Sequence, residues 1–324
     1  MPSTSISDFS PSNDMIWYSD GSVILVVEKT AFRVHASILA AQCEVFKGML
    51  GIPQPAPDAE TGGAEVYEGC PVVRMQDSAV DLTHFLKSIY DFQYFQSGVK
   101  SKFPIVAAVL RLSTKYHAPA LRHRAISFLS TAYPSTLAAW DKRSIQRLIP
   151  PFEDEFCAYV ALATETDVRA ILPGLYYAAA RKPLGQIIPL LRTLAIAPAV
   201  QWDVCSDFVL GRERLFQVEI KHILTFLNVE FKHPGCQALS SCTTILNSTA
   251  RLALRKATEA EAYHQWCSAN ASEVGRSLAL CQPCSTTVEN SIKDARNVVW
   301  EQLPGLFGLP DWETLKARDE LDVE

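Results

Sequence analysis

The sequence predicts an α+β fold, in which a small mixed sheet with helical hairpins is followed by an all-helical extension. Two observations predict this class. Apolar residues within 23–34 form two short runs rich in β-branched side chains, which is typical of paired strands. Beyond residue 134 the apolar positions follow helical spacing instead. The chain has 324 residues, 48% of them hydrophobic, so it has room for about two domains and a sizeable core.

The first elements are two strands. The run Val23–Val27 and the shorter run containing Phe32 and Val34 are joined at residues 28–29, a charged pair that suits a turn. They therefore predict a β-hairpin. The period changes at His35, after which the apolar residues fall at helical spacing: Ile38, Leu39, Phe46, Met49 and Leu50.

The rest of the first region alternates loops, one strand and helices. Ile52–Gly69 is rich in Pro, Gly and acidic residues, so we expect an exposed loop. Val72–Met75 predicts a third strand. An amphipathic helix is expected across residues 82–90, and Pro104 suits the first turn of the next. Leu121–Tyr133 predicts one more helix.

Two motifs give the first region a family resemblance. Residues 32–39 read Phe-x-Val-His-x-x-Ile-Leu, and residues 112–129 read Leu-x-x-Lys-Tyr-x-x-x-x-Leu-x-x-x-Ala-x-x-x-Leu. Together with the order of elements, they closely resemble a BTB/POZ domain at residues 16–133, preceded by a flexible N-terminus at 1–15. The resemblance implies a module that assembles proteins and self-associates as a homodimer. It also gives His35 a structural role at the strand-to-helix junction.

Residues 134–232 predict a helical region. Asp141 is expected to cap a helix at Lys142–Ile149, because its carboxylate can accept hydrogen bonds from a first turn. Gly211 is expected to separate a helix at Val204–Leu210 from another at Arg214–Leu227. Further helices are predicted around residues 156–162, 172–180 and 187–194.

Residues 233–312 predict a cysteine-bearing helical region, and the strongly charged residues 313–324 predict a frayed tail. The segments 205–215 and 300–312 are similar to those of a group of fungal BTB-containing proteins. The resemblance implies a helical C-terminal extension.

Four cysteines are the main chemical candidates. Cys281 and Cys284 have the two-residue spacing of a zinc half-site, whereas Cys236 and Cys242 are separated by five residues, more than is usual. Four thiolates can complete a tetrahedral shell, so we predict a structural metal site, with zinc as the ion. His233 or Cys267 could replace a ligand. The alternatives are buried thiols without metal, and a redox pair at the N-terminus of a helix.

Three aromatic residues follow the predicted helix at 82–90. Phe92, Tyr94 and Phe95 either close the core or form an exposed partner-binding anchor. In relatives of the resembled family that recruit a cullin, an apolar residue here is followed shortly by an acid. Residues 92–102 contain no Asp or Glu, which favours a regulatory scaffold over a substrate adaptor of a cullin-based ubiquitin ligase.

Several function classes are disfavoured. The net charge of −5 and scattered Lys and Arg residues argue against nucleic-acid binding, and the apolar stretches are too short to cross a membrane. Phosphate-binding glycine loops and common hydrolase motifs are missing, so we predict a protein-binding adaptor or scaffold rather than an enzyme. A thiol- or metal-dependent enzyme in the C-terminal half is the alternative. Nine cysteines without a secretory signal predict a cytoplasmic or nuclear location.

Overall fold

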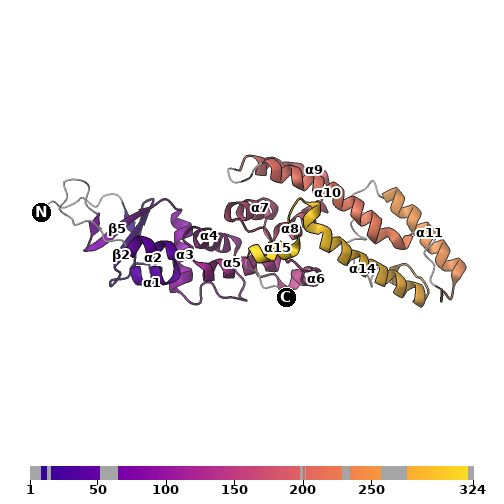
Figure 1. Cartoon of the computed structure of the whole chain (residues 1–324), viewed down its shortest axis with the longest axis horizontal. Helices are drawn as coiled ribbons and strands as arrows, with labels where there is room; N and C mark the ends of the chain where they lie inside the picture. Colours follow the sequence, from indigo (N-terminus) through magenta and orange to yellow (C-terminus); the bar gives the residue numbers. More distant parts are fainter. Residues whose placement is uncertain are drawn as a thin grey trace. The chain divides into compact units, whose positions relative to one another are not determined.

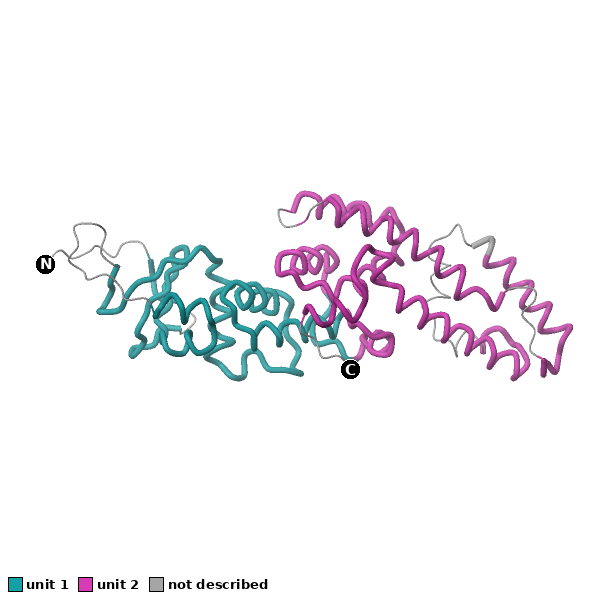
Figure 2. The backbone as a smooth tube through the Cα atoms, in the orientation of Figure 1, with its two compact units in different colours: residues 1–132, 146–151 teal, residues 133–145, 152–324 magenta. Residues whose placement is uncertain are grey.

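The computed structural model describes residues 9–12, 16–51, 65–197, 200, 202–227, 234–256 and 276–319, whose elements are labelled in Figure 1. The chain divides into two compact units (Figure 2). Unit 1 contains residues 1–132 and 146–151, and unit 2 contains residues 133–145 and 152–324. A small sheet lies in unit 1 and the other regular elements of the described residues are helices, so the predicted α+β class is confirmed.

The described residues of unit 1 contain a five-stranded sheet in the order β1-β3-β2-β5-β4. The hairpin is confirmed, because β2 and β3 pair antiparallel from Val23–Val34 to Val27–Thr30. On its other side β2 pairs parallel with β5. All five residues of β2 are buried, which suits a central strand with no polar side chain. The bounds are Ser10–Pro11 for β1, Val23–Val27 for β2, Thr30–Val34 for β3, Val66–Tyr67 for β4 and Cys70–Met75 for β5.

Two short edge strands correct the predictions. Ser10–Pro11 falls in the segment expected to be flexible, yet it pairs parallel with β3. Val66–Tyr67 falls in the expected loop and pairs with β5 across a tight turn, where Gly69 has a φ of 77°. In both cases the backbone N–H and C=O groups form hydrogen bonds with a neighbouring strand. Side-chain composition does not reveal this pairing. The rest of the predicted loop, residues 52–64, lies outside the described residues.

The helices described in unit 1 follow the strands, two after β3 and three after β5. Their bounds are Ala36–Gln42 for α1, Glu44–Gly51 for α2, Ala79–Tyr90 for α3, Phe103–Lys115 for α4 and Pro119–Ala132 for α5. His35 lies at the junction between β3 and α1. Its backbone N–H donates to the Tyr90 hydroxyl at 2.8 Å, and its ring lies 3.2 Å from the Asp20 carboxylate. These contacts give His35 the packing role that the sequence implied.

The regular elements of the described part of unit 2 are all helices. The bounds are Leu137–Gln146 for α6, Glu155–Thr166 for α7, Leu172–Ala180 for α8, Leu184–Ala195 for α9, Trp202–Ile223 for α10, Leu224–Leu227 for the 3-10 turn η1, Leu239–Lys256 for α11, Gln282–Leu306 for α14 and Trp312–Arg318 for α15. Helices α10 and α14 lie side by side (Figure 1). Within the described residues, no helix combines the length and apolar character needed to cross a bilayer.

Two predicted helix boundaries in unit 2 are wrong. Asp141 lies inside α6 rather than at its start, and its carboxylate pairs with Arg296 of α14 at 2.5 and 3.2 Å. Gly211 lies inside α10 rather than at a break. It provides the space for Phe307, because a Cβ at residue 211 would lie 2.1 Å from that ring. Tertiary contacts therefore explain both residues better than local capping rules do.

The predicted frayed tail is also corrected as far as residue 319. Asp311 caps α15 by accepting from the Thr314 N–H at 2.8 Å, and Leu315 is fully buried. The buried Asp319 carboxylate accepts from the Ala170 N–H at 2.6 Å. The charged residues therefore cap and anchor α15.

An ion pair secures the same end of unit 2. Arg318 hydrogen-bonds Asp167, which also accepts from Arg169 at 3.0 Å. Burial alone would raise the pKa of the Asp167 carboxyl, but these two guanidinium groups outweigh it and hold that pKa below its ordinary 3.8.

Candidate metal centre

The four candidate cysteines come together in unit 2. Each offers one sulfur, and all four sulfurs lie within 4.8 Å of one another. The sulfurs of Cys236 and Cys281 are 3.8 Å apart, although the residues are 45 positions apart in the chain. Cys242 and Cys284 are buried, whereas Cys236 and Cys281 are partly exposed. The group is therefore close enough to hold a metal ion.

The starts of two helices position the thiols. Cys281 is the N-cap of α14, and Pro283 lies in the first turn, where its missing N–H costs no hydrogen bond. Cys284 lies three residues beyond the cap, so its side chain returns to the same face as that of Cys281. Cys242 lies in the first turn of α11, and its N–H donates to the Ala238 carbonyl at 2.8 Å.

The five-residue separation of Cys236 and Cys242 is explained by the non-helical segment that precedes α11. Cys236 lies in a non-helical segment, so its position is not fixed by helical periodicity relative to Cys242. His233 and Cys267, the replacement ligands considered from the sequence, lie outside the described residues.

The thiols perturb one another strongly. The backbone N–H of Cys284, followed by that of Gln237, holds the pKa of the Cys281 thiol at about 6. Burial, followed by the neighbouring Cys236 and Cys281 sulfurs, raises the pKa of Cys284. For Cys242, the Cys281 N–H lowers the pKa, but burial and the same two sulfurs outweigh it and raise the pKa. Four sulfurs this close cannot all carry negative charge without a cation among them.

Helix α11 buries few of the side chains that the structure describes. Cys242, Leu246 and Thr249 are buried, and five others are partly buried: Thr243, Ile245, Asn247, Ala250 and Ala253. A bond from Cys242 to a metal would add a further anchor between α11 and the rest of unit 2, because metal-binding free energy contributes directly to folding.

The redox alternative receives little support. Cys281 and Cys284 do lie at the N-terminus of a long helix, as that alternative requires. A thioredoxin-like site also needs a strand leading into the helix, and the described part of unit 2 contains none. Among the described residues, the pair lies in one group with the two other thiols, which favours a metal site.

The three aromatic candidates have different surroundings. Phe92 is 87% exposed and available to a partner. Phe95 is 1% exposed and stacks on Phe128 with ring centroids 4.8 Å apart, so it belongs to the core and the prediction of a contact role is wrong for it. Tyr94 is half-buried, stacks on His84 and hydrogen-bonds its ring nitrogen at 2.5 Å.

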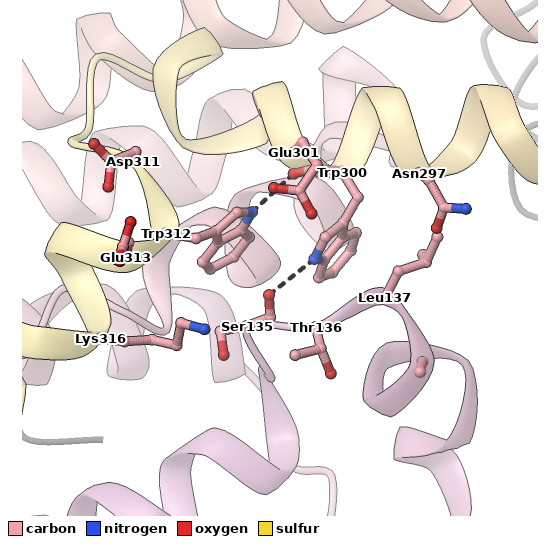
Figure 3. Close-up of a pocket in the computed structure, with 11 residues that line it drawn as sticks. Ser135, Thr136, Leu137, Asn297, Trp300, Glu301, Asp311, Trp312, Glu313 and Lys316 are labelled. Carbon is pink, nitrogen blue, oxygen red and sulfur yellow. Dashed lines mark hydrogen bonds between the residues drawn. The ribbon is translucent and has the colours of Figure 1, made fainter. Parts of the chain in front are cut away.

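Sequence reasoning missed a pocket of about 470 Å³ in unit 2, between the start of α6 and helices α14 and α15 (Figure 3). Trp300 and Trp312 stack at its wall with ring centroids 5.6 Å apart. Trp312 Nε1 donates to the Trp300 carbonyl at 2.8 Å, and Trp300 Nε1 donates to the Ser135 carbonyl at 2.9 Å. Both indole N–H groups therefore serve the fold. The Trp-rich segment 300–312 was the available signal.

No family model, curated protein or solved structure matches this chain.

Proposed function

We propose that this protein is an adaptor that binds other proteins, built from a BTB/POZ-type module and a helical extension stabilised by a structural zinc ion. The observation that carries the zinc assignment is the gathering of four sulfurs within 4.8 Å. A tetrahedron with Zn–S bonds of about 2.3 Å has sulfur–sulfur edges of about 3.8 Å. The separation of Cys236 and Cys281, 3.8 Å, matches that edge.

The centre would be structural rather than catalytic. Four thiolates fill a tetrahedral shell and leave no position for water or substrate, whereas catalytic zinc sites keep one open. Two ligands come from α11 and the segment before it, and two from the start of α14. The ion would therefore join α11 to α14, with its binding free energy contributing directly to folding.

The adaptor assignment rests on unit 1. A β-hairpin leads directly into the helical pair α1 and α2, and further helices follow β5, the order that the BTB/POZ resemblance implies. The exposed ring of Phe92 offers an apolar contact beside α3. We propose homodimerisation and assembly of a regulatory or transcriptional complex. Substrate delivery to a cullin-based ubiquitin ligase is the second candidate, which the acid-free segment 92–102 disfavours.

Metal analysis tests the zinc centre. Protein purified without chelator should contain one zinc per chain, and Cys284→Ser should lose it. Cys157→Ser is the matched control, because Cys157 lies in the same unit outside the cluster. Should C284S fail to fold, chelation of the wild type supplies the second measurement, with a lower thermal midpoint expected. A zinc content far below one per chain would refute the centre.

Light scattering and affinity purification test the adaptor function. A dimer in solution and stoichiometric recovery of specific proteins from native extract are expected. Stoichiometric recovery of a cullin would support the ligase alternative, and its clean absence would refute that alternative. A monomer that recovers no protein would contradict the adaptor assignment itself. The Phe92→Ser variant shows whether the exposed ring takes part.

A further inference from the structure

The candidate zinc centre is unequally covered. Cys242 and Cys284 are 3% and 4% exposed, whereas Cys236 and Cys281 are partly open to solvent. The sulfurs of these two partly exposed residues are also neighbours, 3.8 Å apart; Cys236 precedes α11 and Cys281 caps α14. A small oxidant in solution therefore reaches one particular pair of thiolates before the other.

We propose that this centre is a peroxide-responsive switch, in which oxidation of Cys236 and Cys281 to a disulfide expels the zinc and releases helix α11. This inference rests on the proposed zinc centre. The two sulfurs need to approach by about 1.8 Å to reach bonding distance. The disulfide removes two of the four ligands, and the remaining two thiolates hold zinc far more weakly.

The chemistry balances with hydrogen peroxide as the oxidant. One thiolate attacks an oxygen of peroxide, the O–O bond breaks, and a sulfenic acid and a hydroxide ion form. The second thiolate attacks that sulfur, forming the S–S bond and expelling a second hydroxide. The two sulfurs together lose two electrons, which reduce the peroxide. Two protons from solvent convert the hydroxides to water.

The release of α11 follows from its sparse packing. Without the ion, Cys242 no longer holds this helix to α14. Within the described residues, Leu246 is the one large buried side chain that α11 contributes to the adjoining apolar cluster. The other members of that cluster come from η1 and α14: Phe226, Leu227, Val288 and Ile292. The disulfide keeps the segment before α11 tethered, so oxidation opens the helix without detaching the chain and exposes an apolar surface.

The test uses the full-length, zinc-loaded protein and hydrogen peroxide. Released zinc is followed with a chromogenic chelator, the disulfide is located by peptide mass spectrometry, and hydrogen exchange is measured across residues 239–256. We expect one zinc released per chain, a Cys236–Cys281 disulfide and faster exchange in α11, all reversed by dithiothreitol and added zinc. A disulfide between Cys242 and Cys284, or zinc retained under peroxide, would overturn the switch.

The variant Cys236→His separates the switch from the zinc centre. A Cys3His shell is a common structural zinc site, so the variant should keep its ion, but it cannot form the disulfide. Zinc release by peroxide should slow by about tenfold or more; release at the wild-type rate would overturn the proposal. Protein that never contains zinc would refute the centre and the switch together. Protein that binds zinc but keeps it under peroxide would refute the switch alone.

Discussion

Replacing Gly211 with alanine should destabilise unit 2, even though alanine is the better helix former. The new Cβ would lie 2.1 Å from Cδ1 of Phe307 and 2.7 Å from Cε1, whereas carbon atoms normally pack at about 3.5–4.0 Å. The ring cannot easily move, because Phe307 is 1% exposed and packs against Phe208 and Tyr176. Such overpacking costs about 1–3 kcal/mol, and alanine regains about 1 kcal/mol in helix propensity. With a contact this short, we expect a net loss of about 1–2 kcal/mol.

Urea unfolding followed by circular dichroism measures this loss as a lower transition midpoint. Gly185→Ala is the matched control, because Gly185 also lies in a helix and an added Cβ there meets nothing within 4 Å. The control should gain up to about 1 kcal/mol. If G211A proved as stable as G185A, the close packing of α10 on Phe307 would not constrain residue 211. Adding Phe307→Leu to G211A should recover part of the loss, since it removes the edge of the ring.

Three further predictions concern single contacts. Phe95→Ala should lower the free energy of unfolding by about 3–5 kcal/mol, whereas Phe92→Ser should change it by less than about 0.5 kcal/mol; equal effects in denaturant titrations would contradict their different burial. Asp167→Asn should be less stable than wild type at neutral pH, because Arg318 holds the pKa of this carboxyl low. The Asp167 carboxylate stabilises the fold fully above its unfolded pKa of 3.8, and this stabilisation is lost as the pH falls through the lower pKa of the folded state. The free energies of unfolding of wild type and D167N should therefore converge below the folded-state pKa. A difference that persisted into strong acid would exclude this linkage. Asp141→Asn should cost about 1–2 kcal/mol in thermal or urea unfolding, because it leaves a guanidinium that is 10% exposed without its charged partner; no measurable loss would show the pair to be neutral.

The sequence predicted the fold best where one local pattern is strong. The run Val23–Val27 is continuous, apolar and rich in β-branched residues, and it forms the predicted hairpin with β3. Predictions failed where local sequence rules suggest one role for a residue and its tertiary contacts give it another. Asp141 has the chemistry of a cap, yet it pairs with a residue 155 positions away. Gly211 has the chemistry of a break, yet it makes room for a buried ring. Such long-range partners leave no periodic trace in the sequence.

The candidate metal site could be predicted only in part, from the spacing of its cysteines. The spacing of Cys281 and Cys284 indicated one half, and the structure brings the looser pair to it. What the sequence does not contain is the unequal coverage of the four sulfurs, since that depends on how α11 and α14 pack. The aromatic segment is a similar case. Phe92 and Phe95 are three residues apart in a turn, and only tertiary structure shows which one is buried.

The hydrogen bond from Ala170 to Asp319 closes a loop of 149 residues and sets the order of events during synthesis. At about 5–20 residues per second, the ribosome adds Asp319 roughly 7–30 s after Ala170. Unit 1 draws only on residues up to 151, so it can fold while translation continues. Helix α8 meanwhile waits for α14, against which it packs. Nascent unit 2 therefore keeps apolar surface exposed until its C-terminal helices are made, which is the condition under which chaperones bind a growing chain.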